Sequence, residues 1–148
     1  MVSLVAVLTV AAAVGSGLMG GVFFAFSVAV IPALRRRPAA DAVATMQEIN
    51  RVIVGPLFLL VFLGTAVLGI TLVVLRPTDG LRVLGAALYV LGGFGLTAAV
   101  NIPLNNALDR VRPADAAQGW ERYHRRWALA NHARGLACAA ASVVLAVA

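Results

Sequence analysis

The chain has 148 residues, of which 61% are hydrophobic and only 12% are charged. Soluble globular proteins average about 45–50% apolar and about 25% charged residues, so this composition excludes an ordinary soluble domain and indicates an integral membrane protein. The net charge of +6 is due to twelve arginines, eleven of which lie in or at the edges of the connections between apolar runs. This placement indicates a role in membrane topology and argues against a nucleic-acid partner.

Four apolar runs are each long enough to cross the roughly 30 Å of bilayer hydrocarbon as a helix. We expect spans at about residues 3–34, 54–75, 82–108 and 127–147. The predicted fold is all-α, an antiparallel four-helix transmembrane bundle that forms a single integral membrane domain over residues 1–148. Nine arginines fall in the first and third connections against two in the second, so the positive-inside rule predicts that connections one and three are cytoplasmic and that both termini are outside.

The first span contains closely spaced glycines and phenylalanines. Gly17 and Gly21 form a small-xxx-small pair that lets another helix approach closely, and the sequence leaves a homo-oligomer open. Phe24 lies on the same helical face as these glycines, where its ring either lines an apolar pocket or packs against lipid and core. We include Phe24 among the candidate substrate-binding residues.

The connection between the first two spans has a helical periodicity of its own. Pro38 suits the first turn of a helix, and Val43, Met46 and Ile49 then recur at helical spacing beside charged residues. This pattern predicts a short interfacial helix between the first and second spans. Asn50 lies on or near its apolar side, where the amide either reaches the mouth of the bundle or remains solvated.

Polar side chains form one stripe in the third span and another in the fourth. In the third span, Thr97, Asn101 and Asn105 recur every four residues and share a helical face. The second stripe falls within an arc of roughly 80° and consists of Trp120, His124, Trp127, Asn131, Arg134 and Cys138. Polar groups at membrane depth need partners or a function, so we expect the two stripes near the same membrane edge. The aromatic rings, Trp127 among them, are either an interfacial belt or part of a binding site.

Arg134 lies about two turns inside the fourth span, and no Asp or Glu lies within a span to pair with it. An arginine at this depth should face the bundle and meet acceptors, for which Asn131, Asn101 and Asn105 are the candidates. Two interpretations remain open. The group is either an interhelical polar clamp or an anion-stabilising site at the mouth of an apolar pocket.

The sequence offers little that could hold a cofactor. His124 and His132 are the only histidines, and eight residues of straight helix separate them by about 12 Å, so they cannot bind one metal or haem together. Cys138 is the only cysteine, and the sequence contains no dinucleotide fingerprint, phosphate loop or zinc cluster. We therefore expect no metal site and no organic cofactor.

Several short motifs are spread over most of the chain. They are Gly21-x-Phe-Phe-Ala-Phe-Ser27 with Ile31-Pro-Ala-Leu34, Met46-Gln-x-Ile-Asn50, Asn101-x-Pro-Leu-Asn105, and Trp127 with Asn131-His-x-Arg134. Together they resemble the anthrone oxygenase family of small four-helix membrane proteins. The resemblance implies oxidation by dioxygen of an activated methylene of a hydrophobic polycyclic aromatic, as in anthrone to anthraquinone, without haem or flavin.

Such a reaction requires few protein groups. An anthrone methylene is acidic because its carbanion delocalises as an aromatic enolate, and electron-rich anions of this kind react with dioxygen directly. The protein need only bind a flat apolar substrate, remove a proton and hold the oxyanion. We expect Arg134 with Asn131 or Asn101 to hold the oxyanion, and His124 or His132 to act as the base. The candidate substrate-binding residues are Asn101, Asn105, Trp127, Asn50 and Phe24.

A second class of function uses the same cavity without chemistry. In this alternative the chain is a small-molecule binding protein, a carrier or an accessory membrane protein. Both alternatives predict the same partners, which are the lipid bilayer and a hydrophobic aromatic small molecule.

Overall fold

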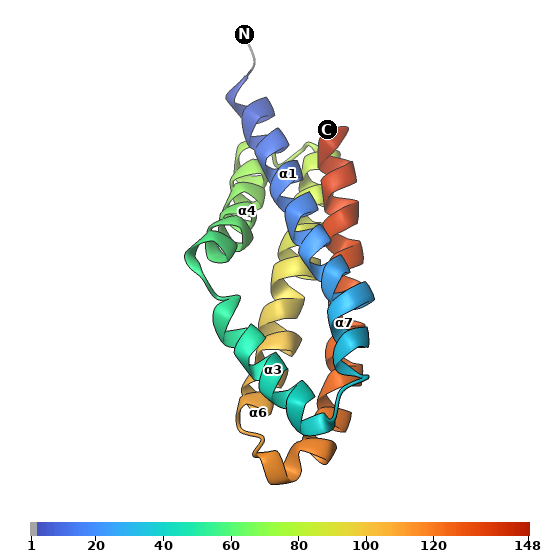
Figure 1. The fold of residues 1–148 in the computed structure, drawn as a ribbon. Helices are drawn as coiled ribbons and strands as arrows, with labels where there is room; N and C mark the ends of the chain where they lie inside the picture. The colour runs from blue at the N-terminus through green and yellow to red at the C-terminus, as the bar shows by residue number, and fades with distance from the viewer. Residues whose placement is uncertain (1–2) are drawn as a thin grey trace.

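The computed structural model describes residues 3–148, and all regular structure in that range is helical. Four helical stretches are long and apolar enough to cross a membrane, at Leu4–Leu34, Pro56–Leu75, Gly80–Asp109 and Pro113–Ala146. The chain is therefore a multi-pass membrane protein, as its composition predicts. Figure 1 shows an elongated molecule in which the start of α1 and the end of α7 lie near one end, and α3 and α6 lie toward the other.

Two of the four stretches, the first and the third, are interrupted by π-helical segments. The first comprises α1 (Leu4–Ala25), the π-helix η1 (Phe26–Val30) and α2 (Ile31–Leu34), and α3 (Ala39–Val52) follows it. The second is α4 (Pro56–Leu75). The third comprises α5 (Gly80–Ala87), the π-helices η2 (Leu88–Gly95) and η3 (Thr97–Asn101), and α6 (Ile102–Asp109). The fourth begins with the 3-10 turn η4 (Pro113–Asp115) and continues as α7 (Ala116–Ala146).

Local sequence explains where three of the four membrane-spanning stretches begin. At the start of α1, the Ser3 hydroxyl accepts a hydrogen bond from the backbone N–H of Ala6. At the start of α5, the Asp79 carboxylate accepts one from the backbone N–H of Arg82, and this bond is the main cause that lowers the pKa of Asp79. Pro56 is the first residue of α4, where its missing N–H leaves no backbone hydrogen bond unmade.

Glycines let the helices approach closely inside the molecule. α1 packs along both α7 and α4. A Cβ atom on Gly20 would lie 3.3 Å from the backbone of Ala139 in α7, and one on Gly15 would lie only 2.0 Å from the Thr65 hydroxyl in α4. Gly21, in contrast, has nothing within 4 Å of its Cβ position. Gly17 also lies close to α7, with the Ser142 hydroxyl 3.1 Å from its Cβ position, so one glycine of the predicted pair is at a helix contact and the other is not.

The helix of the fourth stretch is longer than the span expected at residues 127–147. α7 begins at Ala116 and so includes the end of the polar connection before Trp127. Trp120, Tyr123 and Trp127 recur at helical spacing and are buried in one apolar cluster with residues of α2, α3 and α6. Burial of these rings stabilises the added helical turns, and it makes them core residues rather than a lipid-facing belt.

Helix α3 runs along the half of the molecule that is remote from the C terminus (Figure 1). Val43 and Met46 are buried in the same cluster as the three rings, as the helical spacing predicts. Gln47 Nε2 donates hydrogen bonds to the backbone carbonyls of Leu108 (2.9 Å) and Val111 (3.2 Å), at the end of α6. These bonds fix α3 across α6 and bring Asn50 of α3 to the cavity described next.

Candidate functional site

A cavity of about 150 Å³ lies where the end of α1 and η1 meet α3, α4, η3, α6 and α7. Aromatic rings form much of its wall, including those of Phe23, Phe26, Phe58, Phe62 and Trp127. Six polar side chains also line the cavity: Asn50, Thr97, Asn101, Asn105, Asn131 and Arg134. We call this space the polar cavity. The structure therefore brings six of the nine candidate site residues to one place: Asn50, Asn101, Asn105, Trp127, Asn131 and Arg134.

Arg134 is the only positively charged residue in the lining of the polar cavity, and it is 5% exposed. Its Nη1 donates to the Thr97 hydroxyl (3.0 Å) and its Nη2 to Asn131 Oδ1 (2.8 Å). Its Cζ lies 4.2 Å from the centre of the Phe23 ring. None of the ion pairs within residues 3–148 includes Arg134. The partners of Arg134 are thus a hydroxyl group, an amide oxygen and the face of a ring, none of which carries a negative charge. The positive charge remains available to an anion.

Asn131 holds Arg134 in place, and both the NH₂ group and the oxygen of its side-chain amide are hydrogen-bonded. Its Nδ2 donates to the backbone carbonyl of Phe23 (2.7 Å) and to the Ser27 hydroxyl (2.8 Å), while its Oδ1 accepts from Arg134. Ser27 belongs to the π-helix η1. Short π-helical segments within α-helices occur frequently at functional sites. Here η1 accepts one of the hydrogen bonds that join α7 to the first membrane-spanning stretch.

Asn101 and Asn105 contribute the amides of the third stretch. Asn105 Oδ1 accepts hydrogen bonds from the Tyr123 hydroxyl (2.9 Å) and from Trp127 Nε1 (2.8 Å). Asn101 is 1% exposed, and its Nδ2 makes one long hydrogen bond of 3.5 Å to the backbone carbonyl of Trp127. The neighbouring rings of α7 therefore orient Asn105 firmly, while Asn101 retains capacity for another partner.

Two buried polar atoms of the cavity residues have no hydrogen-bond partner within residues 3–148. They are Asn101 Oδ1, an acceptor, and Arg134 Nε, a donor. A buried polar group without a partner costs about 1–3 kcal/mol. A ligand that presents an acceptor to Arg134 and a donor to Asn101 would recover that free energy.

The polar cavity reaches the outer surface of the helices. Val54, in the turn between α3 and α4, and Ile102, at the start of α6, both line it and are 57% and 46% exposed.

Neither histidine lines the polar cavity. His124 is buried nearer the start of α7. Its Nδ1 lies 2.9 Å from the backbone oxygen of Trp120, and its ring stacks on the Trp120 ring with 5.5 Å between the ring centres. His132 is exposed on the outer face of α7. The expected base therefore has no contact with a ligand in the polar cavity, although both residues belong to the same helix as Arg134.

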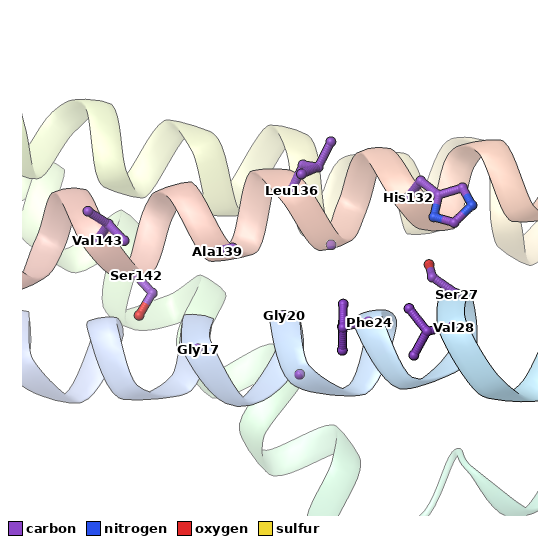
Figure 2. Close-up of a pocket in the computed structure, with 12 residues that line it drawn as sticks. Gly17, Gly20, Phe24, Ser27, Val28, His132, Leu136, Ala139, Ser142 and Val143 are labelled. Atoms are coloured by element: carbon purple, nitrogen blue, oxygen red, sulfur yellow. The ribbon is translucent and has the colours of Figure 1, made fainter.

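His132 and Phe24 instead line a separate groove of about 740 Å³ between α1 and α7. Figure 2 shows His132 of α7 and Ser27 of η1 facing each other across this groove, with Phe24 beside them. Gly21 is part of its lining, so the face that carries Phe24 and the glycines is the outer face of the helix rather than the wall of the polar cavity. Ser27 is the link between the two spaces, because it also accepts the hydrogen bond from Asn131.

Sequence reasoning left three residues of this arrangement outside the candidate site. Thr97 accepts from Arg134, and its spacing of four from Asn101 was the available signal. Ser27 belongs to the Gly21-to-Ser27 motif, but nothing in that motif indicates a bond to α7. Tyr123 orients Asn105, and its position four residues before Trp127 places it on the same helical face.

Within residues 3–148, no group of three or more His, Cys, Asp or Glu side chains is arranged to hold a metal ion. A family model described as anthrone oxygenase matches residues 44–144, which is more than half of the chain. The match runs from α3 to α7 and includes every polar side chain of the polar cavity. A search of curated proteins found no match, and neither did a search of solved structures.

Proposed function

This chain belongs to the anthrone oxygenase family, and on that premise we propose that it is a membrane oxygenase for hydrophobic polycyclic aromatics. It uses dioxygen as co-substrate to oxidise an activated methylene of the anthrone type, without haem or flavin. The observation that carries the proposal is the pair of unsatisfied atoms in the polar cavity, Arg134 Nε and Asn101 Oδ1. They suit a substrate whose ring carries an oxygen that becomes negative and a neighbouring hydroxyl that can donate.

The size of the polar cavity indicates how such a substrate lies. An engineered apolar cavity of about 150 Å³ binds benzene, and the polar cavity has the same volume. We therefore place the oxygen-bearing end of the substrate inside, among the aromatic walls, and the remaining rings between Val54 and Ile102 toward the lipid. Entry from the bilayer suits a substrate that is poorly soluble in water.

Loss of the methylene proton is the first step. The electron pair of the broken C–H bond delocalises onto the ring oxygen, and the buried Arg134 guanidinium holds the resulting oxyanion. Asn131 and Thr97 keep the guanidinium in position through their hydrogen bonds. The lining contributes no imidazole or carboxylate, so we assign water as the proton acceptor. Loss of the proton is favoured because Arg134 stabilises the oxyanion that forms.

Reaction with dioxygen completes the conversion. The carbanion carbon gives one electron to dioxygen and combines with the superoxide so formed, and protonation yields a hydroperoxide on the former methylene carbon. Loss of the second hydrogen of that carbon as a proton breaks the O–O bond and leaves a ketone and one molecule of water. One oxygen atom ends in the ketone and the other in water, so no additional reductant is needed.

We further propose that the 148 residues form one integral membrane domain in which the four long stretches cross the bilayer in alternating directions, with α3 at the interface. Connections one and three are then cytoplasmic and both termini are outside. The nine-to-two distribution of arginines supports this orientation. The position of the start of α1 and the end of α7 near one end of the molecule supports the alternation (Figure 1).

A specific observation favours the alternative of a carrier or binding protein. The polar cavity has no side chain in its lining that commonly acts as a general base, and Arg134 and Asn101 would hold an aromatic ligand equally well without chemistry. In that case the purified protein binds an anthrone but does not speed its oxidation.

The experiment that tests the proposal measures oxygen uptake by the purified protein in detergent with an anthrone as substrate. We expect uptake above the spontaneous rate, with one quinone formed per dioxygen consumed, and a much slower reaction in the Arg134→Leu variant. Binding of the anthrone without any uptake above the spontaneous rate would instead support the carrier.

A further inference from the structure

A second pocket, of about 270 Å³, lies between the end of α6 and the first turns of α7. Leu104 and Ala107 of α6 form part of its apolar wall, together with Val111 in the connection that follows. The guanidinium-bearing side chains of Arg122 and Arg126 on α7 border the same pocket. The pocket thus combines an apolar wall with two positive charges, and it is separate from the polar cavity.

The two arginines have no anionic partner in the part of the chain that the structure describes. Neither Arg122 nor Arg126 takes part in an ion pair within residues 3–148, whereas Arg125, which lies between them, pairs with Glu121 at 3.0 Å. Because they are four residues apart on one helix, their like charges repel each other. An anion bound between them would remove that repulsion and make charge-assisted hydrogen bonds with both.

The position of the pocket identifies the anion. It lies at the end of the molecule that carries α3 and most of the arginines, which is where a membrane protein meets the lipid headgroups. Ala107 and Leu104 lie about half a turn and about one and a half turns before the end of α6 at Asp109, so the apolar wall lies beside the two arginines. A free inorganic anion would leave this wall without a partner, whereas an acyl chain would cover it.

We propose that this pocket binds an anionic phospholipid. The headgroup phosphate lies between Arg122 and Arg126, and an acyl chain lies along Leu104 and Ala107. Basic pockets between membrane helices are suited to lipids of this charge. Tyr123 also lines the pocket and donates its hydroxyl hydrogen bond to Asn105, so the bound lipid packs against a residue that shapes the polar cavity.

The test compares lipid retention by full-length variants purified in detergent, with native mass spectrometry as the readout. The wild-type protein is expected to retain one phosphatidylglycerol and to discriminate against phosphatidylcholine. Replacing Arg122 and Arg126 together with glutamine should weaken retention roughly thirtyfold, since each arginine near an anionic surface contributes about a factor of five. The matched control is Arg125→Gln, which removes the same charge from the neighbouring position outside the pocket and should retain the lipid.

A second variant keeps the test decisive if loss of the two arginines prevents folding. Ala107→Phe fills the apolar wall without changing the charge, and we expect it to displace the acyl chain and lower retention. Inorganic phosphate at the same concentration should not compete with phosphatidylglycerol if the acyl chain contributes to binding. The proposal is overturned if Arg125→Gln weakens retention as much as the double variant, if Ala107→Phe retains the lipid fully, or if phosphate alone displaces it.

Discussion

Replacing Arg134 with leucine separates a structural role of the polar cavity from a catalytic one. The change leaves the fully buried Asn131 Oδ1 without its donor, at a cost of about 1–3 kcal/mol, and removes the contact with the Phe23 ring, worth about 2 kcal/mol. It also removes a charge whose burial within a span costs roughly 2.5–3.5 kcal/mol. Because these contributions largely cancel, we expect the variant to fold, with a thermal stability close to that of the wild-type protein.

The effect on the reaction should be much larger. Arg134 is the only cation in the lining of the polar cavity, and loss of one donor to a developing oxyanion slows a reaction by about 10²–10³-fold. Arg134→Lys retains the charge but not the planar fork that reaches both Thr97 and Asn131, so its activity should lie between those of the wild-type protein and the leucine variant. The assay is anthrone-dependent oxygen uptake, measured beside thermal unfolding in the same detergent.

Two outcomes would refute this reasoning. Wild-type oxygen uptake by a folded Arg134→Leu variant would remove Arg134 from the mechanism. Unfolding of both the leucine and the lysine variants would show that the guanidinium mainly clamps the helices together, as buried polar groups do in many membrane proteins.

Four further predictions address topology, the groove, the aromatic ring that orients an amide, and cofactors. Cysteines introduced at Ala114 and Asp79 should react with impermeant thiol reagents from opposite sides of the membrane, Ala114 from the cytoplasm, and labelling of both from one side would contradict the proposed topology. His132→Ala should retain wild-type oxygen uptake, whereas a hundredfold loss, typical of a missing general base, would move the reaction to the groove. Trp127→Phe removes one of two donors to Asn105 and should lower the free energy of unfolding by about 1 kcal/mol in denaturant titrations. The purified protein should show no Soret absorption and no stoichiometric zinc or iron by elemental analysis, and either finding would contradict the cofactor prediction.

The membrane-spanning stretches could be predicted because hydrophobic length is a local property of the chain. The burial of residues 116–126 could not, because they are polar by composition and their burial depends on a tertiary contact. Trp120 and Tyr123 are buried against α3, and the sequence shows their spacing but not the helix that covers them. A short amphipathic helix such as α3 can lie on lipid or on protein, and its sequence pattern is the same in both cases.

The candidate site was predicted in part for a related reason. Residues three or four apart on one helix share a face, so Asn101 and Asn105, and likewise Asn131 and Arg134, could be assigned to one cavity from their spacing. Helical angle does not give depth or neighbours, however. His124 lies in the same arc as Arg134 but about 15 Å away along α7, and it is covered by Trp120 instead of facing the cavity.

Isotope labelling tests the central claim most directly, that this protein uses dioxygen itself to convert an aromatic methylene to a ketone. The purified protein is supplied with an anthrone and ¹⁸O₂ in unlabelled water, and the quinone is analysed by mass spectrometry against a sample that contains heat-inactivated protein. We predict that one ¹⁸O atom enters each quinone molecule, at a rate that depends on intact protein and falls in the Arg134→Leu variant. A quinone that takes its new oxygen from water, or that forms equally fast with heat-inactivated protein, would contradict the account.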